Sequence, residues 1–171
     1  MIQCTGMLFA VLGRLGGVLL FAAIVLELAH RLRLKRGGLP VWRRLRSLGE
    51  RGAAFDPGPL YLAVGIAPVL LFVSSPWSLA IAALPSLADS AAAMAGLVID
   101  GPRLPGSSRK TIAGSAMFFL VATAAGMVVG ISLFHAVVLG IVGVIVEWAS
   151  PRGTDNLLLA AAGVLTMVVF A

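Results

Sequence analysis

Long apolar runs separated by short polar segments dominate this chain. Six runs approach the roughly 20 residues that a helix needs to cross the hydrocarbon core of a bilayer. They cover residues 7–29, 59–74, 77–99, 111–133, 135–148 and 156–171. The connections after the second and fourth runs are very tight, so the runs on either side of each should pair as antiparallel helices. The pattern predicts an all-α, polytopic membrane helix bundle with about six transmembrane spans.

The composition agrees with this prediction. The chain has 171 residues, of which 60% are hydrophobic and 12% charged, whereas a soluble domain has about 25% charged residues. Its single cysteine excludes an internal disulfide. We expect one structural domain in two parts. Residues 1–58 would form the first span and a basic cytoplasmic interfacial segment, and residues 59–171 the transmembrane core.

The positive charges are unevenly placed. Eight of the thirteen Lys and Arg residues lie between Arg31 and Arg51. With six spans, the loops 30–58, 100–110 and 149–155 share one face, and they hold every cation except Arg14. By the positive-inside rule this face is cytoplasmic. A basic stretch between spans suits anionic membrane lipids better than nucleic acid, so no nucleic-acid partner is expected. The stretch would be a membrane-surface anchor or a lid over a lipid-binding groove.

Asp89 is an ionisable residue inside the third apolar run, four residues after Pro85. Such residues are costly in a membrane and are therefore functional candidates. Pro85 is expected to interrupt the helix and admit water near the carboxylate. An inter-helix hydrogen bond is one interpretation, and a metal-binding or catalytic carboxylate is the favoured one.

A glycine- and proline-containing loop leads into the fourth run, which opens with five polar residues: Ser107, Ser108, Arg109, Lys110 and Thr111. Ser107 or Ser108 is predicted to cap the helix, leaving further backbone N–H groups free for an anion. Arg109 offers a planar fork for phosphate oxygens and Lys110 a mobile point charge. The pair could instead serve only to set the topology.

Three acids approach the same cationic face. Glu147 lies at the end of the fifth run, and Asp155 and Asn156 follow Thr154 at the start of the sixth. As a purely structural alternative, Thr154 caps the last helix and Asp155 complements its dipole. Asp89, Glu147 and Asp155 opposite Arg109 and Lys110 would be compatible with a Mg²⁺ ion and nucleotide phosphates between the two sets of charges.

These spacings resemble the family of dolichol kinases, phytol kinases and CTP-dependent diacylglycerol kinases, which is related to phosphatidate cytidylyltransferases. Its pattern D-x-x-A-x3-G is matched by Asp89, Ala92 and Gly96. Its pattern K-K-T-x-E-G is matched by Arg109, Lys110, Thr111 and Gly114, with Arg for the first Lys. Glu147 and the Asp155–Asn156 pair resemble its later acid and Asp-Asn, so that the resemblance covers roughly residues 50–171.

The chain departs from this family at three positions. Ala88 replaces the glycine before the aspartate, Asp100 stands where a glycine is expected, and Ala113 replaces the glutamate of the second pattern. The chain also lacks the H-G-G-x-x-D-R-x-D ending of the cytidylyltransferases, which favours the kinase branch.

The resemblance implies transfer of the γ-phosphoryl group of CTP to a long-chain isoprenoid alcohol (polyprenol, dolichol or phytol type) or diacylglycerol at the cytoplasmic face. It implies catalytic roles for Asp89, Lys110, Glu147 and Asp155, and Mg²⁺ binding by Asp89 and Asp155. The nucleotide would be bound by Ser108, Arg109, Lys110, Thr111, Gly114 and Asn156.

Two other functions remain open from the sequence. One is a cytidylyltransferase that makes a CDP-lipid from a lipid phosphate, and the other is a non-catalytic lipid-binding membrane protein or small transporter. Glycine pairs in the later runs favour close helix packing and would permit a homodimer.

Overall fold

A computed structural model of the chain describes residues 11, 13–19, 21–22, 58–99, 101–106, 110–151 and 154–170. The basic segment between Arg31 and Arg51 lies outside the described residues, as do Asp100, Ser107, Ser108 and Arg109. The described elements are helical: α3 (Gly58–Phe72), α4 (Trp77–Ala83), the π-helical segment η2 (Leu84–Ala88), α5 (Asp89–Val98), α6 (Ile112–Val129), α7 (Leu133–Ala149) and α8 (Asp155–Phe170).

Local signals explain the turn between α6 and α7. Gly130 ends α6 in the left-handed region, with φ of 101°, which glycine adopts without steric cost. Ser132 then caps α7, because its hydroxyl accepts a hydrogen bond from the backbone N–H of His135. The two helices can therefore pack against each other as an antiparallel pair.

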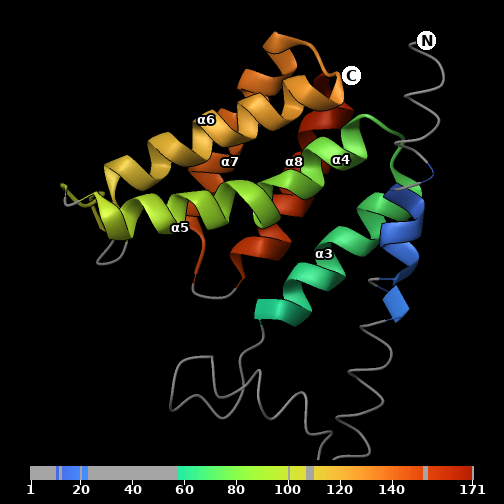
Figure 1. Cartoon of the computed structure of the whole chain (residues 1–171), viewed down its shortest axis with the longest axis horizontal. Coiled ribbons are helices and arrows are strands. Elements are labelled where there is room, and N and C mark those ends of the chain that lie inside the picture. Colours follow the sequence, from blue (N-terminus) through green and yellow to red (C-terminus); the bar gives the residue numbers. More distant parts are fainter. Residues whose placement is uncertain are drawn as a thin grey trace, which may run out of the picture.

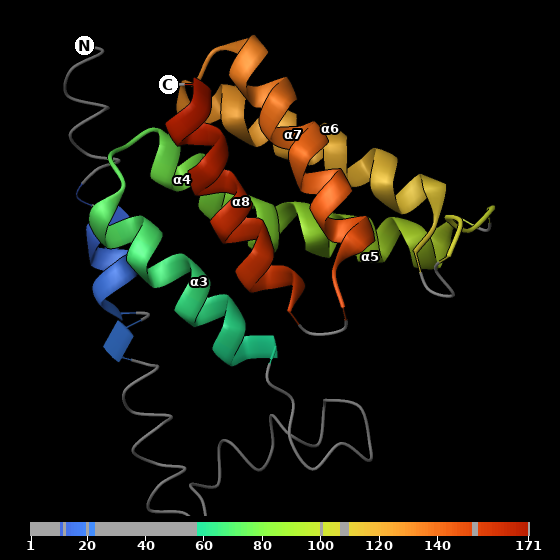
Figure 2. The ribbon, with the colours of Figure 1, turned by 180° about the vertical axis from the view of Figure 1, so that it is seen from behind.

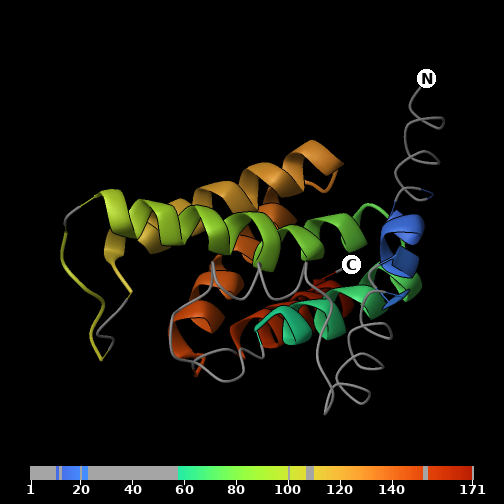
Figure 3. The ribbon, with the colours of Figure 1, turned by 60° about the horizontal axis from the view of Figure 1, so that its bottom comes forward.

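Figure 1 shows α5 and α6 side by side, with α7 behind them. Seen from behind in Figure 2, α8 lies between α7 and α3 and packs against both. Figure 3 shows α3 and α8 as a layer beneath α5 and α6. The described part of the first apolar run, helical at residues 13–19, lies beside α3, where Gly17 approaches Leu70 and Leu71.

Small residues let these helices approach closely. An added Cβ at Gly143 of α7 would lie 2.5 Å from Phe118 of α6, and one at Gly163 of α8 would lie 2.7 Å from Ile81 of α4. Phe118 and Ile81 are both fully buried. Aromatic and aliphatic side chains therefore fill the space left by glycine, as in other bundles whose helices associate through small residues.

Two helices are long and apolar enough to cross a membrane. They are the continuous helix Trp77–Val98, of 22 residues, and Ile112–Val129, of 18 residues. Large apolar side chains project from both, such as Leu97 (87% exposed) and Val128 (80% exposed). Such exposed apolar side chains are compatible with a surface that faces lipid. The shorter apolar helices are Tyr61–Phe72, Leu133–Ala149 and Asp155–Phe170.

The prediction of an all-α fold is confirmed for the described residues. The last five apolar runs correspond to α3, to α4 through α5, and to α6, α7 and α8, with boundaries that differ by a few residues. Two helices meet the length and hydropathy expected of a span, so the count of six spans stays a prediction.

Replacing Gly143 with Ala should destabilise the bundle by about 1–3 kcal/mol, because the new methyl group would overlap Phe118 in a filled core. Thermal unfolding in detergent would measure the loss. Gly16→Ala is the matched control: its new methyl group would meet Leu70 at an ordinary 3.8 Å, so stability should stay equal or rise slightly. Equal stability of the two variants would contradict this account of the α6–α7 contact.

Candidate active site at the charged end of the bundle

Asp89 lies at a change of helical geometry. The helix does not break at Pro85 as expected, but passes through the π-helical segment Leu84–Ala88 and continues as α5 from Asp89. A π-helical turn widens the helix around the proline, whose ring prevents the usual hydrogen bond. Single π turns of this kind are frequent at functional sites. The Asp89 side chain emerges half-buried directly after it.

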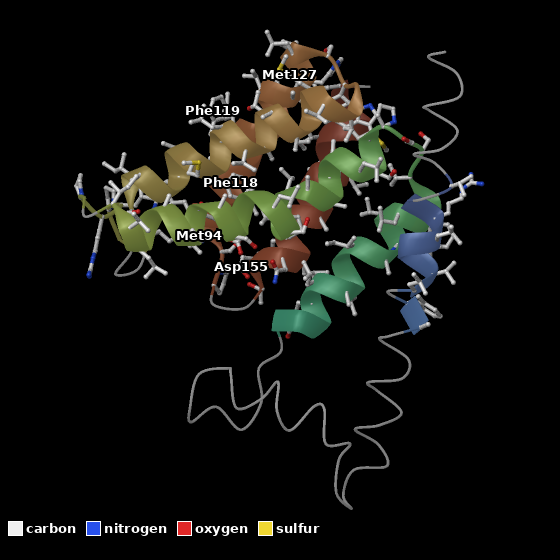
Figure 4. All side chains as sticks on the ribbon, in the orientation of Figure 1. Met94, Phe118, Phe119, Met127 and Asp155 are labelled. Carbon is white, nitrogen blue, oxygen red and sulfur yellow. The ribbon has the colours of Figure 1, made fainter. Side chains whose placement is uncertain are left out.

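Four ionisable side chains from separate elements gather around this point. Asp89 of α5 lies within electrostatic range of Asp155, Glu147 and Lys110. Glu147 comes from the last turn of α7, Asp155 begins α8, and Lys110 precedes α6. Figure 4 shows Asp155 where α8 begins, facing α5. The structure thus brings together the four residues predicted to be catalytic.

Lys110 and Glu147 form the central contact of this group. The Lys110 Nζ atom lies 3.3 Å from Glu147 Oε1 and also donates a hydrogen bond to the backbone carbonyl of Glu147. That carbonyl is one of the last four of α7, which have no partner within the helix. Lys110 therefore caps α7, neutralises the buried Glu147 (6% exposed) and complements the negative end of the helix dipole.

The second carboxylate oxygen of Glu147 is buried and has no hydrogen-bond partner among the described residues. Burying such an acceptor without a partner costs about 1–3 kcal/mol. An additional donor or cation at this point would remove that cost. The site therefore has unused capacity to bind a positive group or a hydrogen-bond donor.

A short hairpin holds Lys110 in position. The backbone N–H of Leu104 donates to the Lys110 carbonyl at 2.8 Å, and that of Ile112 donates to Pro102 at 3.0 Å. The indole N–H of Trp148, the residue after Glu147, donates to the carbonyl of Pro105 at 3.1 Å. The hairpin is thus fastened to the end of α7.

The expectation that Ser107 or Ser108 caps the fourth helix is wrong. Thr111, in an extended conformation, is the N-cap of α6, and its hydroxyl accepts a hydrogen bond from the N–H of Gly114 at 3.0 Å. Since Ile112 N–H is bonded to Pro102, two of the free N–H groups expected for an anion are already occupied. The hairpin displaces the start of the helix to residue 112, so Lys110 precedes the helix instead of opening it.

The two sequence patterns meet where α5 crosses α6. An added Cβ at Gly114 would lie 2.9 Å from the carbonyl oxygen of Ala92, and one at Gly96 would lie 3.0 Å from Thr111 Oγ1. Ala92, Gly96, Thr111 and Gly114 therefore have a packing role in this chain. Their predicted contact with nucleotide remains a prediction.

At the start of α8, the N–H of Leu158 donates to the carbonyl of Thr154, and the N–H of Asn156 donates to Asp155 Oδ1 at 3.1 Å. The Thr154 hydroxyl donates to the carbonyl of Pro151. Asp155 thus complements the positive end of α8, as the structural alternative predicted. The backbone of Asn156 also lies at a close helix crossing, since a Cβ at Gly65 would lie 3.2 Å from its carbonyl oxygen.

The predicted metal ligands are near one another but do not form a closed metal cage. Within the described parts of the chain, no three His, Cys, Asp or Glu side chains are grouped closely enough to hold a metal ion. Mg²⁺ is commonly held by one or two carboxylates plus substrate phosphates. Asp89 and Asp155 could supply the protein share of such a site.

The opposite end of the bundle holds a polar contact that the sequence did not reveal. The Nδ1 atom of His135 lies 2.6 Å from the Ser132 hydroxyl, and its Nε2 atom lies 2.8 Å from the carbonyl oxygen of Phe170. The ring also packs edge-on against Trp77. His135 therefore joins the ends of α4, α7 and α8, and satisfies one of the last carbonyls of α8.

Comparison with known proteins identifies no relative: no family model, curated protein or solved structure matches the chain.

Lys110→Met should destabilise the bundle by about 3–5 kcal/mol, because it leaves the Glu147 carboxylate buried without its cation. Chemical unfolding in detergent would measure the change. Adding Glu147→Gln to this variant should recover part of the loss, which a double-mutant cycle would reveal. Arg103→Met, at an exposed cation of the same hairpin, is the control. An equal effect of the Lys110 and Arg103 variants would disprove the capping role.

Thr111→Val should cost about 1 kcal/mol by removing the hydroxyl that caps α6. Thr111→Ser keeps the hydroxyl and should retain most of the stability. Thermal unfolding of the three proteins side by side would test the assignment, and a Val variant as stable as the Ser variant would contradict it.

Proposed function

We propose that this chain is a multi-pass membrane enzyme that transfers the γ-phosphoryl group of CTP to a long-chain lipid alcohol at the cytoplasmic face. The acceptor would be an isoprenoid alcohol or diacylglycerol. The observation that carries the proposal is that Asp155, Glu147 and Lys110 all lie within electrostatic range of Asp89, and that Lys110 pairs with Glu147, between helices that are otherwise apolar. The type of reaction is taken from the resemblance of the sequence to CTP-dependent lipid kinases.

The location of the charges supports a membrane-surface enzyme. Lys110, Glu147 and Asp155 all lie at helix ends on one side of the bundle, and Asp89 reaches them from within the third apolar helix. CTP would approach this end from water, and the positive-inside rule makes it cytoplasmic. The lipid alcohol would approach from the bilayer, because its chain cannot enter water without cost.

Phosphoryl transfer needs positioned groups and charge neutralisation more than covalent chemistry from the protein. The lipid hydroxyl oxygen would bond to the γ-phosphorus while the bond to the β,γ-bridging oxygen breaks, releasing CDP and the hydroxyl proton. Asp89 would orient the hydroxyl and accept its proton. Lys110 and Arg109 would hold phosphate oxygens, with Glu147 keeping the Lys110 ammonium in place.

Mg²⁺ would neutralise the phosphate charge when bound by Asp89 and Asp155 together with phosphate oxygens. The chemistry of the two hard carboxylates suits this ion, which is commonly held by one or two carboxylates together with substrate phosphates.

One observation favours a second candidate, a non-catalytic lipid-binding membrane protein. Lys110 caps α7, and Thr111 and Gly114 serve in capping and packing. These structural roles alone would explain much of the second sequence pattern. Asp89 distinguishes the two candidate functions. The enzyme gives this carboxylate a role, whereas the described structure shows no capping or packing role for it.

A transfer assay with [γ-³²P]CTP, Mg²⁺ and a panel of long-chain alcohols should label the lipid. Asp89→Asn should lower kcat by about 10²-fold or more, since it removes the base and a metal ligand but keeps the shape. Ser90→Ala, at the exposed neighbour whose hydroxyl donates to the Ser86 carbonyl, should leave the rate unchanged. Unfolding of both variants would show whether the bundle is intact.

The products distinguish the candidates. Release of pyrophosphate with cytidine on the lipid would instead show a cytidylyltransferase. No transfer by intact protein, or full activity of Asp89→Asn, would refute the kinase mechanism and favour the non-catalytic protein.

A further inference from the structure

A hollow of about 360 Å³ lies between α6 and α7, near the charged end of both helices. Leu104 of the hairpin lines the hollow, and most of the other lining residues are aliphatic or aromatic: Ile112, Phe119, Val144 and Ile145. Figure 4 shows Phe119 on the side of α6 away from α5. The volume of the hollow falls within the range of about 300–1,000 Å³ that is typical of ligand pockets.

One hydroxyl in this wall lacks the usual partner. The hydroxyls of Ser86, Ser90 and Thr166 donate to the carbonyl four residues earlier, whereas two buried hydroxyls of α6, those of Ser115 and Thr123, have no partner among the described residues. Of these two residues, Ser115 lines the hollow. A buried hydroxyl without a partner is costly, and a ligand oxygen would supply one.

The side chains around the hollow favour an apolar occupant. The rim consists of exposed apolar side chains, among them Ile112 (51% exposed) and Ile145 (54% exposed). The hollow therefore opens onto a surface suited to lipid chains. Its lining residues Leu104 and Val144 lie next to the candidate active site, because Leu104 is hydrogen-bonded to Lys110 and Val144 is about one helical turn before Glu147.

The described part of the first helix lies beside α3, where Gly13 approaches Leu70 and Leu79. This is the far side of the bundle from the α6–α7 hollow. The described residues of the chain therefore leave the hollow open to a ligand from outside.

We propose that the α6–α7 hollow holds the part of the lipid alcohol nearest its hydroxyl, and that the Ser115 hydroxyl hydrogen-bonds to the alcohol oxygen while the lipid waits beside the candidate active site. This inference rests on the proposed function, because it assigns a position to the acceptor of that reaction. Ala116, which also lines the hollow, is the position at which a larger side chain would fill it.

The test uses full-length protein in nanodiscs and a long-chain alcohol that carries a photoreactive diazirine near its hydroxyl end. Illumination of the wild-type protein should label α6 and α7 at the hollow. Ala116→Phe should abolish that labelling and raise KM for the alcohol by about tenfold or more, with KM for CTP unchanged. Ala124→Phe, at an exposed alanine of α6 outside the hollow, is the matched control.

Ser115→Ala provides a second variant with no added bulk, and it should raise KM for the alcohol without lowering stability. Labelling elsewhere on the wild-type protein, or labelling and KM unaffected by Ala116→Phe, would overturn the inference even if the kinase is active. Cross-links between two copies of the chain at this face would also overturn it. Labelling of the hollow without γ-phosphoryl transfer would support the lipid site and refute the kinase.

Discussion

The contact between Lys110 and Glu147 is the interaction on which the charged end of the bundle depends. Glu147 is buried near the end of α7, where both its carboxylate and its backbone carbonyl need a donor. Lys110 serves both groups from the hairpin before α6. The contact therefore fastens that hairpin to α7, and it places the Lys110 ammonium group within electrostatic range of Asp89. Packing and candidate chemistry rely here on the same two side chains.

Close approach of helices explains how residues far apart in the sequence share this site. Gly114 allows α6 to lie against the backbone of Ala92, and Gly65 allows α3 to lie against the backbone of Asn156. Polar groups at these helix ends then face a common space. At the opposite end of the bundle, His135 joins α4, α7 and α8, and one of its ring nitrogens lies next to the carbonyl oxygen of Phe170. In an apolar environment every such backbone group must find a partner within the protein.

Much of the candidate site could be predicted from the sequence, because ionisable residues are conspicuous in apolar runs. Asp89 was identified in this way, and so were three residues that lie within electrostatic range of it: Lys110, Glu147 and Asp155. The residue that caps the fourth helix was predicted wrongly. Which hydroxyl caps a helix depends on the backbone conformation before it, and Thr111 caps α6 because the hairpin extends through Lys110. Residues 107–109 fall outside the described structure, and their predicted roles stand as predictions.

By itself, the sequence determined the all-helical fold and the approximate helix limits, since apolar runs and their polar interruptions are local properties. The sequence also predicts that the cations gather on one side, an expectation that depends on the count of six spans. The tertiary structure alone decided that Lys110 pairs with Glu147, that Trp148 fastens the hairpin, and that Ser115 faces a hollow. These arrangements bring together residues from different elements, and they depend on how the helices and the hairpin pack against one another, which no local pattern of residues specifies.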